Sequence, residues 1–210
     1  MDDLTSSFIV IGVTALVVAA IFFFSHRSKE RNQKAIQDMA VRHGWEYTVI
    51  RERLAWGSQL SGKNWDLVAR SEHIGQPSDS GSANIQSDTT WKAAWNNPPG
   101  FTMLIGPRLS NSSVGLFIPP EYAGMKELET GMSEFAQRYV VLGKGEYDLD
   151  FLRISTIPRQ LLNWSEKNRP LIKIDQQFLE IKTNNHRIDK PEELEQVVLL
   201  GEAILAALDR

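Results

Sequence analysis

The four histidines are the side chains best suited to bind a metal ion or to exchange protons near neutral pH. No two of them stand three or four residues apart, and the HExxH motif is absent, whereas a metal site needs three or four converging ligands. The chain contains no cysteine, which excludes disulfides, thiolate nucleophiles and cysteine-based metal sites. We therefore predict surface histidines and no metal site. The histidines are His26, His43, His73 and His186.

A short acidic cluster contains Glu146, Asp148 and Asp150. Two aspartates in a DxD pattern can hold Mg²⁺ or Ca²⁺ when a substrate phosphate completes the coordination. The neighbouring glycines, Gly143 and Gly145, favour a solvated loop instead. The interpretation of this cluster as an acidic loop is therefore preferred to a metal site.

Serine and phosphate-loop motifs give no catalytic signal either. The segment Ser61-Gly62-Lys63 is not a phosphate loop, because Asn64 stands where GxxxxGK[ST] requires Ser or Thr and no helix is predicted after it. No GxSxG nucleophile elbow occurs. The sequence thus predicts no catalytic residue and no cofactor, and we expect a protein that is not an enzyme.

Trp91 and Trp95 are the aromatic pair most able to contact a partner. They lie four residues apart in a predicted strand, so they share one face of it, with Ala93 between them. Such a pair can belong to the core, to a protein interface, where tryptophan is enriched, or to a site that stacks on a ligand ring. Core is the favoured interpretation, and both residues are also candidate interface residues.

The longest apolar stretch runs from Phe8 to Phe24 and contains no charge. As a helix it would rise by about 26 Å, close to the ~30 Å hydrocarbon core of a bilayer. It predicts a transmembrane helix over residues 8–25, preceded by a short non-cytoplasmic N-terminus over residues 1–7. A cleaved signal peptide is disfavoured, because the leading segment carries Asp2 and Asp3 rather than basic residues.

A basic segment follows the apolar stretch and predicts its orientation. Lys and Arg remain on the cytoplasmic side of a span, so we expect the N-terminus outside and the C-terminal domain in the cytoplasm. The segment also predicts a juxtamembrane helix over residues 26–44 that ends at Gly44. Its cations are candidates for contact with lipid head groups, namely Arg27, Lys29, Arg31 and Lys34. Ile36 and Met39 form an apolar stripe that packs on the following domain or docks on a neighbouring protein.

Residues 45–210 predict an α+β domain with a mixed, mostly antiparallel sheet and packed helices. Strands are predicted at 45–50, 54–60, 65–70, 89–95, 101–106, 114–118, 139–142, 171–174 and 178–182. A surface or binding loop is expected over residues 71–90, and a possible subdomain boundary near 143–150. Asp189 is predicted to cap a C-terminal helix that has Pro191 in its first turn and packs across the sheet.

The charge balance and the absence of catalytic motifs narrow the function. The chain has a net charge of −3, which argues against nucleic acid as a partner. We expect a non-catalytic accessory or scaffolding subunit of a larger membrane complex, possibly an energy-converting one, with the lipid bilayer and other integral membrane proteins as partners. The alternative is a membrane-tethered domain or enzyme that binds a small ligand near Trp91 and Trp95.

Overall fold

The computed structural model of the chain describes residues 2–74, 84–94, 100–108, 124–145, 149–153, 155–183 and 186–209. Side chains are described for those residues except 2–12, 15, 25 and 167.

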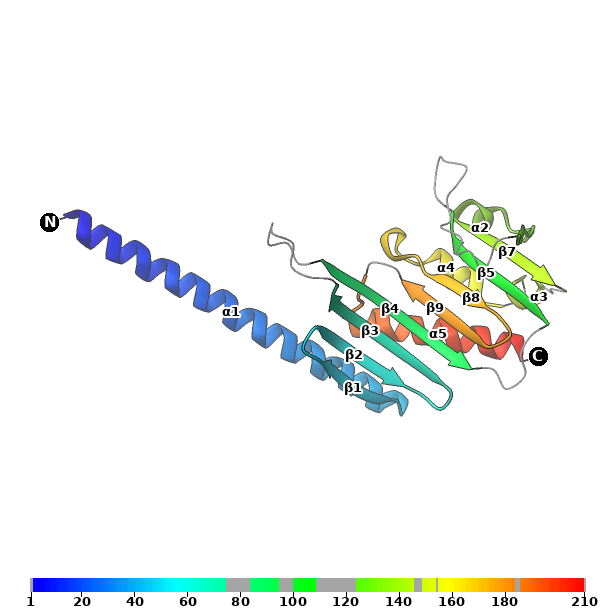
Figure 1. Cartoon of the computed structure of the whole chain (residues 1–210), viewed down its shortest axis with the longest axis horizontal. Helices are drawn as coiled ribbons and strands as arrows, with labels where there is room; N and C mark the ends of the chain where they lie inside the picture. The colour runs from blue at the N-terminus through cyan, green and yellow to red at the C-terminus, as the bar shows by residue number, and fades with distance from the viewer. Residues whose placement is uncertain are drawn as a thin grey trace.

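Within these residues, nine antiparallel strands form one sheet in the order β1-β2-β3-β4-β9-β8-β5-β7-β6 (Figure 1). The first four strands are a meander, and the hairpin of β8 and β9 then lies between β4 and β5. Strands distant in sequence are thus neighbours in the middle of the sheet. The bounds are β1 (Glu46–Arg51), β2 (Ala55–Ser61), β3 (Trp65–His73), β4 (Ile85–Ala94), β5 (Phe101–Pro107), β6 (Lys126–Glu127), β7 (Tyr139–Gly145), β8 (Leu171–Ile174) and β9 (Phe178–Thr183).

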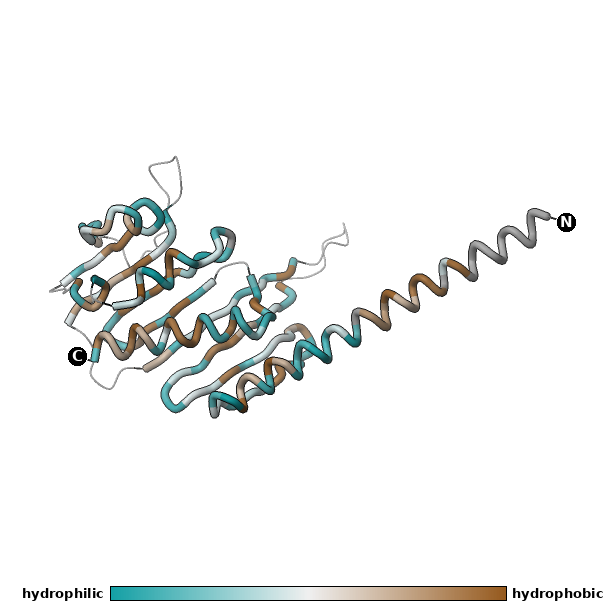
Figure 2. Tube along the Cα trace, turned by 180° about the vertical axis from the view of Figure 1, so that it is seen from behind, coloured by the Kyte–Doolittle hydropathy of each residue, from teal (hydrophilic) through white to brown (hydrophobic). Residues whose placement is uncertain are grey.

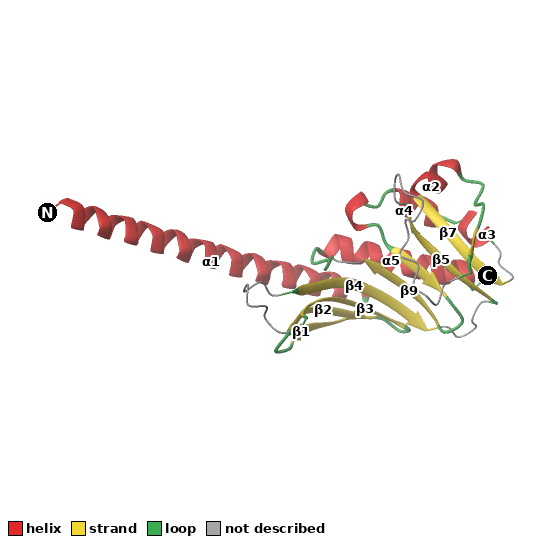
Figure 3. Cartoon of the chain, turned by 45° about the horizontal axis from the view of Figure 1, so that its top comes forward, coloured by secondary structure: helices red, strands yellow, loops and turns green. Residues whose placement is uncertain are grey.

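One face of the sheet carries the helices and the main core (Figure 3). Alternate strand residues such as Leu67, Trp91 and Ile181 point to this face and are fully buried. Helix α5 contacts β4 and β9, and the C-terminal part of α1 contacts α5 and β1. The helical elements are α1 (Asp2–His43), α2 (Ser133–Arg138), α3 (Asp150–Arg153), α4 (Ile157–Leu162), the short 3-10 helix η2 (Glu166–Asn168) and α5 (Pro191–Leu208).

Helix α5 has the amphipathic pattern expected of a helix that crosses a sheet. Pro191 occupies its first turn, and Leu194, Val197 and Ile204 are among its buried side chains. The prediction that Asp189 caps this helix is wrong. Lys190 is the cap residue because its carbonyl accepts the first helical hydrogen bond, from the N–H of Leu194.

Most of the described residues within the loop predicted over residues 71–90 are strand, and residues 75–83 lie outside the described part of the chain. β3 extends to His73, β4 begins at Ile85, and these two residues are paired. Polar residues such as Ser71 and Ser87 are accommodated because their hydroxyl groups bond to each other at 2.8 Å across the two strands. A hydrogen bond between the two strands thus stabilises a segment that has few apolar residues. The sequence alone does not show which residues are paired in this way.

Other predicted elements agree with the structure. The structure confirms the predicted positions of β2, of the β8–β9 hairpin and of the C-terminal end of α1. Gly44, which follows α1, adopts a left-handed φ of +70°. The predicted strand at 114–118 lies outside the described residues. β7 and the β8–β9 hairpin, which flank residues 143–150, belong to the same sheet.

The prediction of a transmembrane span from Phe8 to Phe24 is wrong. In the described part of the chain, no helix combines the length and the apolar character needed to cross a membrane. The stretch is instead part of a 42-residue helix that continues into charged residues.

The topology that depended on this span is overturned as well. Single-pass membrane localisation, with the N-terminus outside and a cytoplasmic C-terminal domain, is not supported by the structure. The α+β class with a large antiparallel sheet is confirmed. The fold is thus the predicted sheet domain preceded by a long helix.

Candidate functional site: the cleft beneath α1

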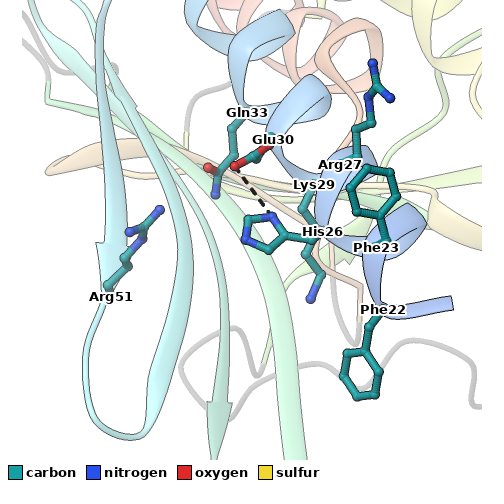
Figure 4. Close-up of a pocket in the computed structure, with 8 residues that line it drawn as sticks. All are labelled: Phe22, Phe23, His26, Arg27, Lys29, Glu30, Gln33 and Arg51. Atoms are coloured by element: carbon teal, nitrogen blue, oxygen red, sulfur yellow. Dashed lines mark ion pairs between the residues drawn. The ribbon is translucent and has the colours of Figure 1, made fainter. Parts of the chain in front are cut away.

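A cleft opens between α1 and strands β1 and β2, where α1 leaves the sheet (Figure 4). The outer part has a volume of about 1070 Å³ and the inner part about 260 Å³. Both parts are lined by Lys29, Gln33 and Arg51, so they meet as one hollow. We call it the α1 cleft. It exists because the straight helix and the twisted edge of the sheet diverge on the N-terminal side of Ile36.

Strand alternation supplies one wall of the α1 cleft. Tyr47, Val49 and Arg51 follow one another at every second position of β1 and line its inner part. In the register of the sheet, Val49 is opposite Ser58 and Arg51 is opposite Trp56, and residues opposite each other share a face. Two neighbouring strands thus present polar, aromatic and cationic side chains to the same space.

The segment before α5 supplies the other wall. Arg187, Ile188 and Asp189 line the inner part of the cleft. The side-chain amide of Asn32 donates a hydrogen bond to the carbonyl of Asp189, and the N–H of Ile188 donates one to the hydroxyl of Thr89 at 2.8 Å. These two bonds hold the segment between α1 and the sheet.

The hydroxyl of Tyr47 is the one polar atom of the inner cleft that is buried without a hydrogen-bond partner among the described residues. Burial raises the pKa of Tyr47 above its ordinary value, and the nearby Arg51 guanidinium opposes this rise. The phenol is therefore neutral near pH 7 and able to donate a hydrogen bond. A buried hydroxyl without a partner costs about 1–3 kcal/mol.

Cations outnumber carboxylates around the α1 cleft, although the whole chain is acidic. Figure 4 shows Arg51 reaching from β1 toward His26 and Gln33 of α1. Glu30 pairs with His26 at 3.5 Å. In the described part of the chain, Lys29, Arg51 and Arg187 form no ion pair. The cleft therefore presents an excess of positive charge to a ligand.

An exposed apolar segment of α1 begins at the mouth of the cleft and extends away from the domain (Figure 2). Its large apolar side chains are between 46% and 72% exposed. They are distributed around the helix rather than along one stripe, so this part of α1 has no distinct apolar face that could pack on the domain. We call these residues the apolar segment: Val13, Leu16, Val17, Val18, Ile21, Phe22, Phe23 and Phe24.

Three of the four candidate interface residues lie in the core, which is the interpretation that the sequence favoured. Trp91, Ile36 and Met39 are buried in the chain's own core, so they offer no surface to a partner. For Ile36 and Met39 this is the packing on the following domain that the apolar stripe predicts. Trp95 lies outside the described residues.

The predicted lipid-contacting cations, Arg27, Lys29, Arg31 and Lys34, are exposed on α1. The structure brings Arg27 and Lys29 to the α1 cleft, and the contact with lipid head groups stays a prediction. Phe8 has no described side chain, whereas Phe24 is exposed in the apolar segment.

Sequence reasoning missed Tyr47 and Arg187. Tyr47 lies in a predicted strand, and its spacing from Arg51 already indicated that the two side chains share one face of that strand. Arg187 follows a turn and shares no motif with β1, so only the folded chain brings the two together. Among the described residues, no group of three or more potential metal ligands is clustered.

Comparisons with known proteins give no family. No protein-family model matches the chain, and no curated protein matches its sequence. Among solved structures, the mycobacterial trehalose monomycolate transport factor A, TtfA, is similar with a TM-score of 0.42 and 9% sequence identity. The match covers 84% of this chain and 94% of that one. A similarity at this level carries no argument about function.

Proposed function

We propose that this protein is a non-catalytic accessory or scaffolding subunit that joins a larger assembly through the apolar segment of α1. The observation that carries the proposal is the exposure of this segment on a helix that projects from the domain (Figure 1). Large exposed apolar patches on proteins mark sites of association.

The chemistry of the segment indicates the kind of partner. Because apolar side chains surround the helix, one flat surface would cover only some of them. A partner that supplies apolar helices on several sides would cover the rest, and integral membrane proteins expose helices of this kind. A protein with apolar helices is therefore the proposed occupant, and the earlier prediction of integral membrane partners is retained in this form.

The position of the segment favours docking over a role in folding. Helix α1 packs on the domain through residues nearer its C-terminal end, including Met39 and Ala40, which are buried. The described apolar segment adds nothing to that core. Its exposed residues cost solubility. A binding role would explain why they are present.

Site-specific crosslinking in the native cells tests the proposal. A photoreactive phenylalanine analogue is placed at Leu16 or Phe23, and at Val41 as the control, since Val41 is equally exposed but lies beside the domain. We expect a discrete protein adduct from the two segment positions and none from Val41. Adducts with lipid only, with a second copy only, or equal adducts from Val41 would overturn the proposal.

Once the crosslinked partner is identified, affinity gives a quantitative check. Burying one phenylalanine contributes ~1.5–3 kcal/mol, and 1.4 kcal/mol corresponds to a factor of ten. The double substitution Phe22→Asp with Phe23→Asp should therefore weaken binding at least tenfold, with an unchanged thermal unfolding midpoint. Undiminished affinity in this variant would contradict the proposed surface.

A further inference from the structure

The α1 cleft combines three features that a single class of ligand would satisfy. Among the described residues, the cations Lys29, Arg51 and Arg187 have no ion-pair partner and the buried hydroxyl of Tyr47 has no hydrogen-bond partner, and apolar walls lie toward the apolar segment. We propose that the cleft binds an amphiphile with one apolar chain and an anionic head group, either a carboxylate or a phosphate. This proposal shares the surface of Phe22 and Phe23 with the protein partner proposed above, and its test uses small probes without that partner.

The inner part of the cleft is suited to the head group. Lys29, Arg51 and Arg187 approach it from α1, β1 and the segment before α5, so three separate elements surround one space. An anion placed there gains from all three charges, and hydrogen bonds between cations and carboxylate or phosphate oxygens are among the strongest in proteins. The neutral Tyr47 phenol supplies a further donor.

The opposing carboxylates do not cancel this charge. Two carboxylates, Glu30 and Asp189, line the cleft against four Lys and Arg side chains, and both carboxylates are exposed. A cationic ligand would therefore meet more cations than free carboxylates. The charge of the cleft selects for anions.

The outer part of the cleft is suited to the chain. Phe22 and Phe23 line it and are 72% and 61% exposed, which leaves apolar surface for a ligand to cover. Ile36, Val49 and Trp56 add apolar surface to the inner part of the cleft. The outer part alone, about 1070 Å³, is at the upper end of the ~300–1,000 Å³ typical of small-molecule sites, so the cleft has room for an extended chain.

Binding of short-chain probes to the full-length protein tests the proposal. Dodecyl phosphate and dodecanoate are compared with dodecyl maltoside, dodecyltrimethylammonium and inorganic phosphate, all below their micelle concentrations, by isothermal titration calorimetry. We expect one molecule of an anionic probe per chain, bound at least tenfold more tightly than the neutral or cationic probe. Equal affinity of the neutral probe, several molecules per chain, or equally tight inorganic phosphate would overturn the proposal. An acidic peptide that binds more tightly than both anionic probes would do so too.

Matched variants locate the site. The double variant Arg51→Gln with Arg187→Gln should weaken dodecyl phosphate binding at least tenfold, whereas Arg53→Gln, an exposed cation of the neighbouring turn, should leave it unchanged. Equal affinities in the two variants would refute the assignment.

Tyr47→Phe separates a ligand contact from a structural role. The hydroxyl has no partner among the described residues, so its removal should not lower the stability of the free protein. We expect about fivefold weaker binding of dodecyl phosphate together with an unchanged or raised unfolding midpoint. Unchanged binding would remove Tyr47 from the site.

Discussion

The indole ring of Trp91 lies directly against the backbone of Gly201, so that a Cβ atom added to this glycine would stand 2.5 Å from Cζ2 of the ring. This contact lets α5 approach β4 closely, and Trp91 is fully buried beneath the helix. A glycine inside a helix normally lowers stability. Here it makes room for the largest side chain of the core.

Replacing this glycine is the first prediction. Gly201→Ala would gain ~0.5–1 kcal/mol from helix propensity. Crowding a packed core costs ~1–3 kcal/mol, so the net effect should be a loss of about 1–2 kcal/mol. Urea unfolding followed by tryptophan fluorescence measures it. Gly100→Ala is the control, because a Cβ atom added there would have no described atom within 4 Å apart from its chain neighbours. A Gly201→Ala variant more stable than the wild type would contradict the close contact.

The hydroxyl of Thr89 gives the second prediction. It accepts a hydrogen bond from the N–H of Ile188 at 2.8 Å and donates one to the carbonyl of His186 at 3.2 Å. Thr89→Val keeps the shape but leaves the N–H of Ile188 unpaired, which should cost ~1–3 kcal/mol in the free energy of unfolding. The carbonyl of His186 keeps a second bond, from the hydroxyl of Thr183 at 3.2 Å.

Thr89→Val should also displace Arg187 in the α1 cleft, because Arg187 lies between His186 and Ile188, the two residues that bond to Thr89. We expect weaker binding of dodecyl phosphate in Thr89→Val. Thr90→Val, on the same strand but the opposite face, is the control and should change neither quantity appreciably. Equal effects of the two substitutions would show that Thr89 has no special role in placing this segment.

The third prediction concerns the pH dependence of stability at Tyr139. Its hydroxyl donates to the carbonyl of Leu161 at 3.0 Å, and burial raises the pKa to about 12 from 10.0, with Arg169 and Arg138 opposing the rise. Because the folded-state pKa is the higher one, the stabilisation is complete below pH 10. It is lost as the pH rises through about 12, and a shift of this size corresponds to ~3 kcal/mol.

Tyr139→Phe tests this dependence. It should cost about 1 kcal/mol at pH 8 through the lost hydrogen bond, and it should flatten the decline in stability between pH 10 and 12. Urea unfolding at several pH values measures both effects. If the stability of the variant declined as steeply as that of the wild type, the pH dependence would come from other groups.

The fourth prediction concerns the attachment of α1 to α5. Nε2 of His43 lies 2.5 Å from Oε1 of Glu195, and the His43 ring stacks on Trp45. A double-mutant cycle with His43→Ala and Glu195→Ala should give a coupling of ~0.5–1 kcal/mol, at the upper end for partly exposed pairs. The more exposed pair of Lys190 and Glu193 serves as the control and should couple less. Equal couplings would mean that the contact adds nothing to helix docking.

Local patterns predicted much of the fold because they arise from neighbouring residues. The left-handed Gly44, the apolar stripe of Ile36 and Met39, and the amphipathic α5 all follow from spacing within one or two turns. The prediction of a membrane span at Phe8–Phe24 was wrong. It rested on the composition of this stretch alone, which does not show that the stretch belongs to a 42-residue helix that continues into charged residues.

The sequence by itself determined the class of the fold, the period of each element and the excess of apolar residues near the start of the chain. Only the tertiary structure decided that the β8–β9 hairpin lies between β4 and β5, and that Tyr47, Arg51 and Arg187 surround one cleft. The physical reason is that periodicity is a property of adjacent residues. The pairing of distant strands depends on the core that the whole chain buries together, which no single segment contains.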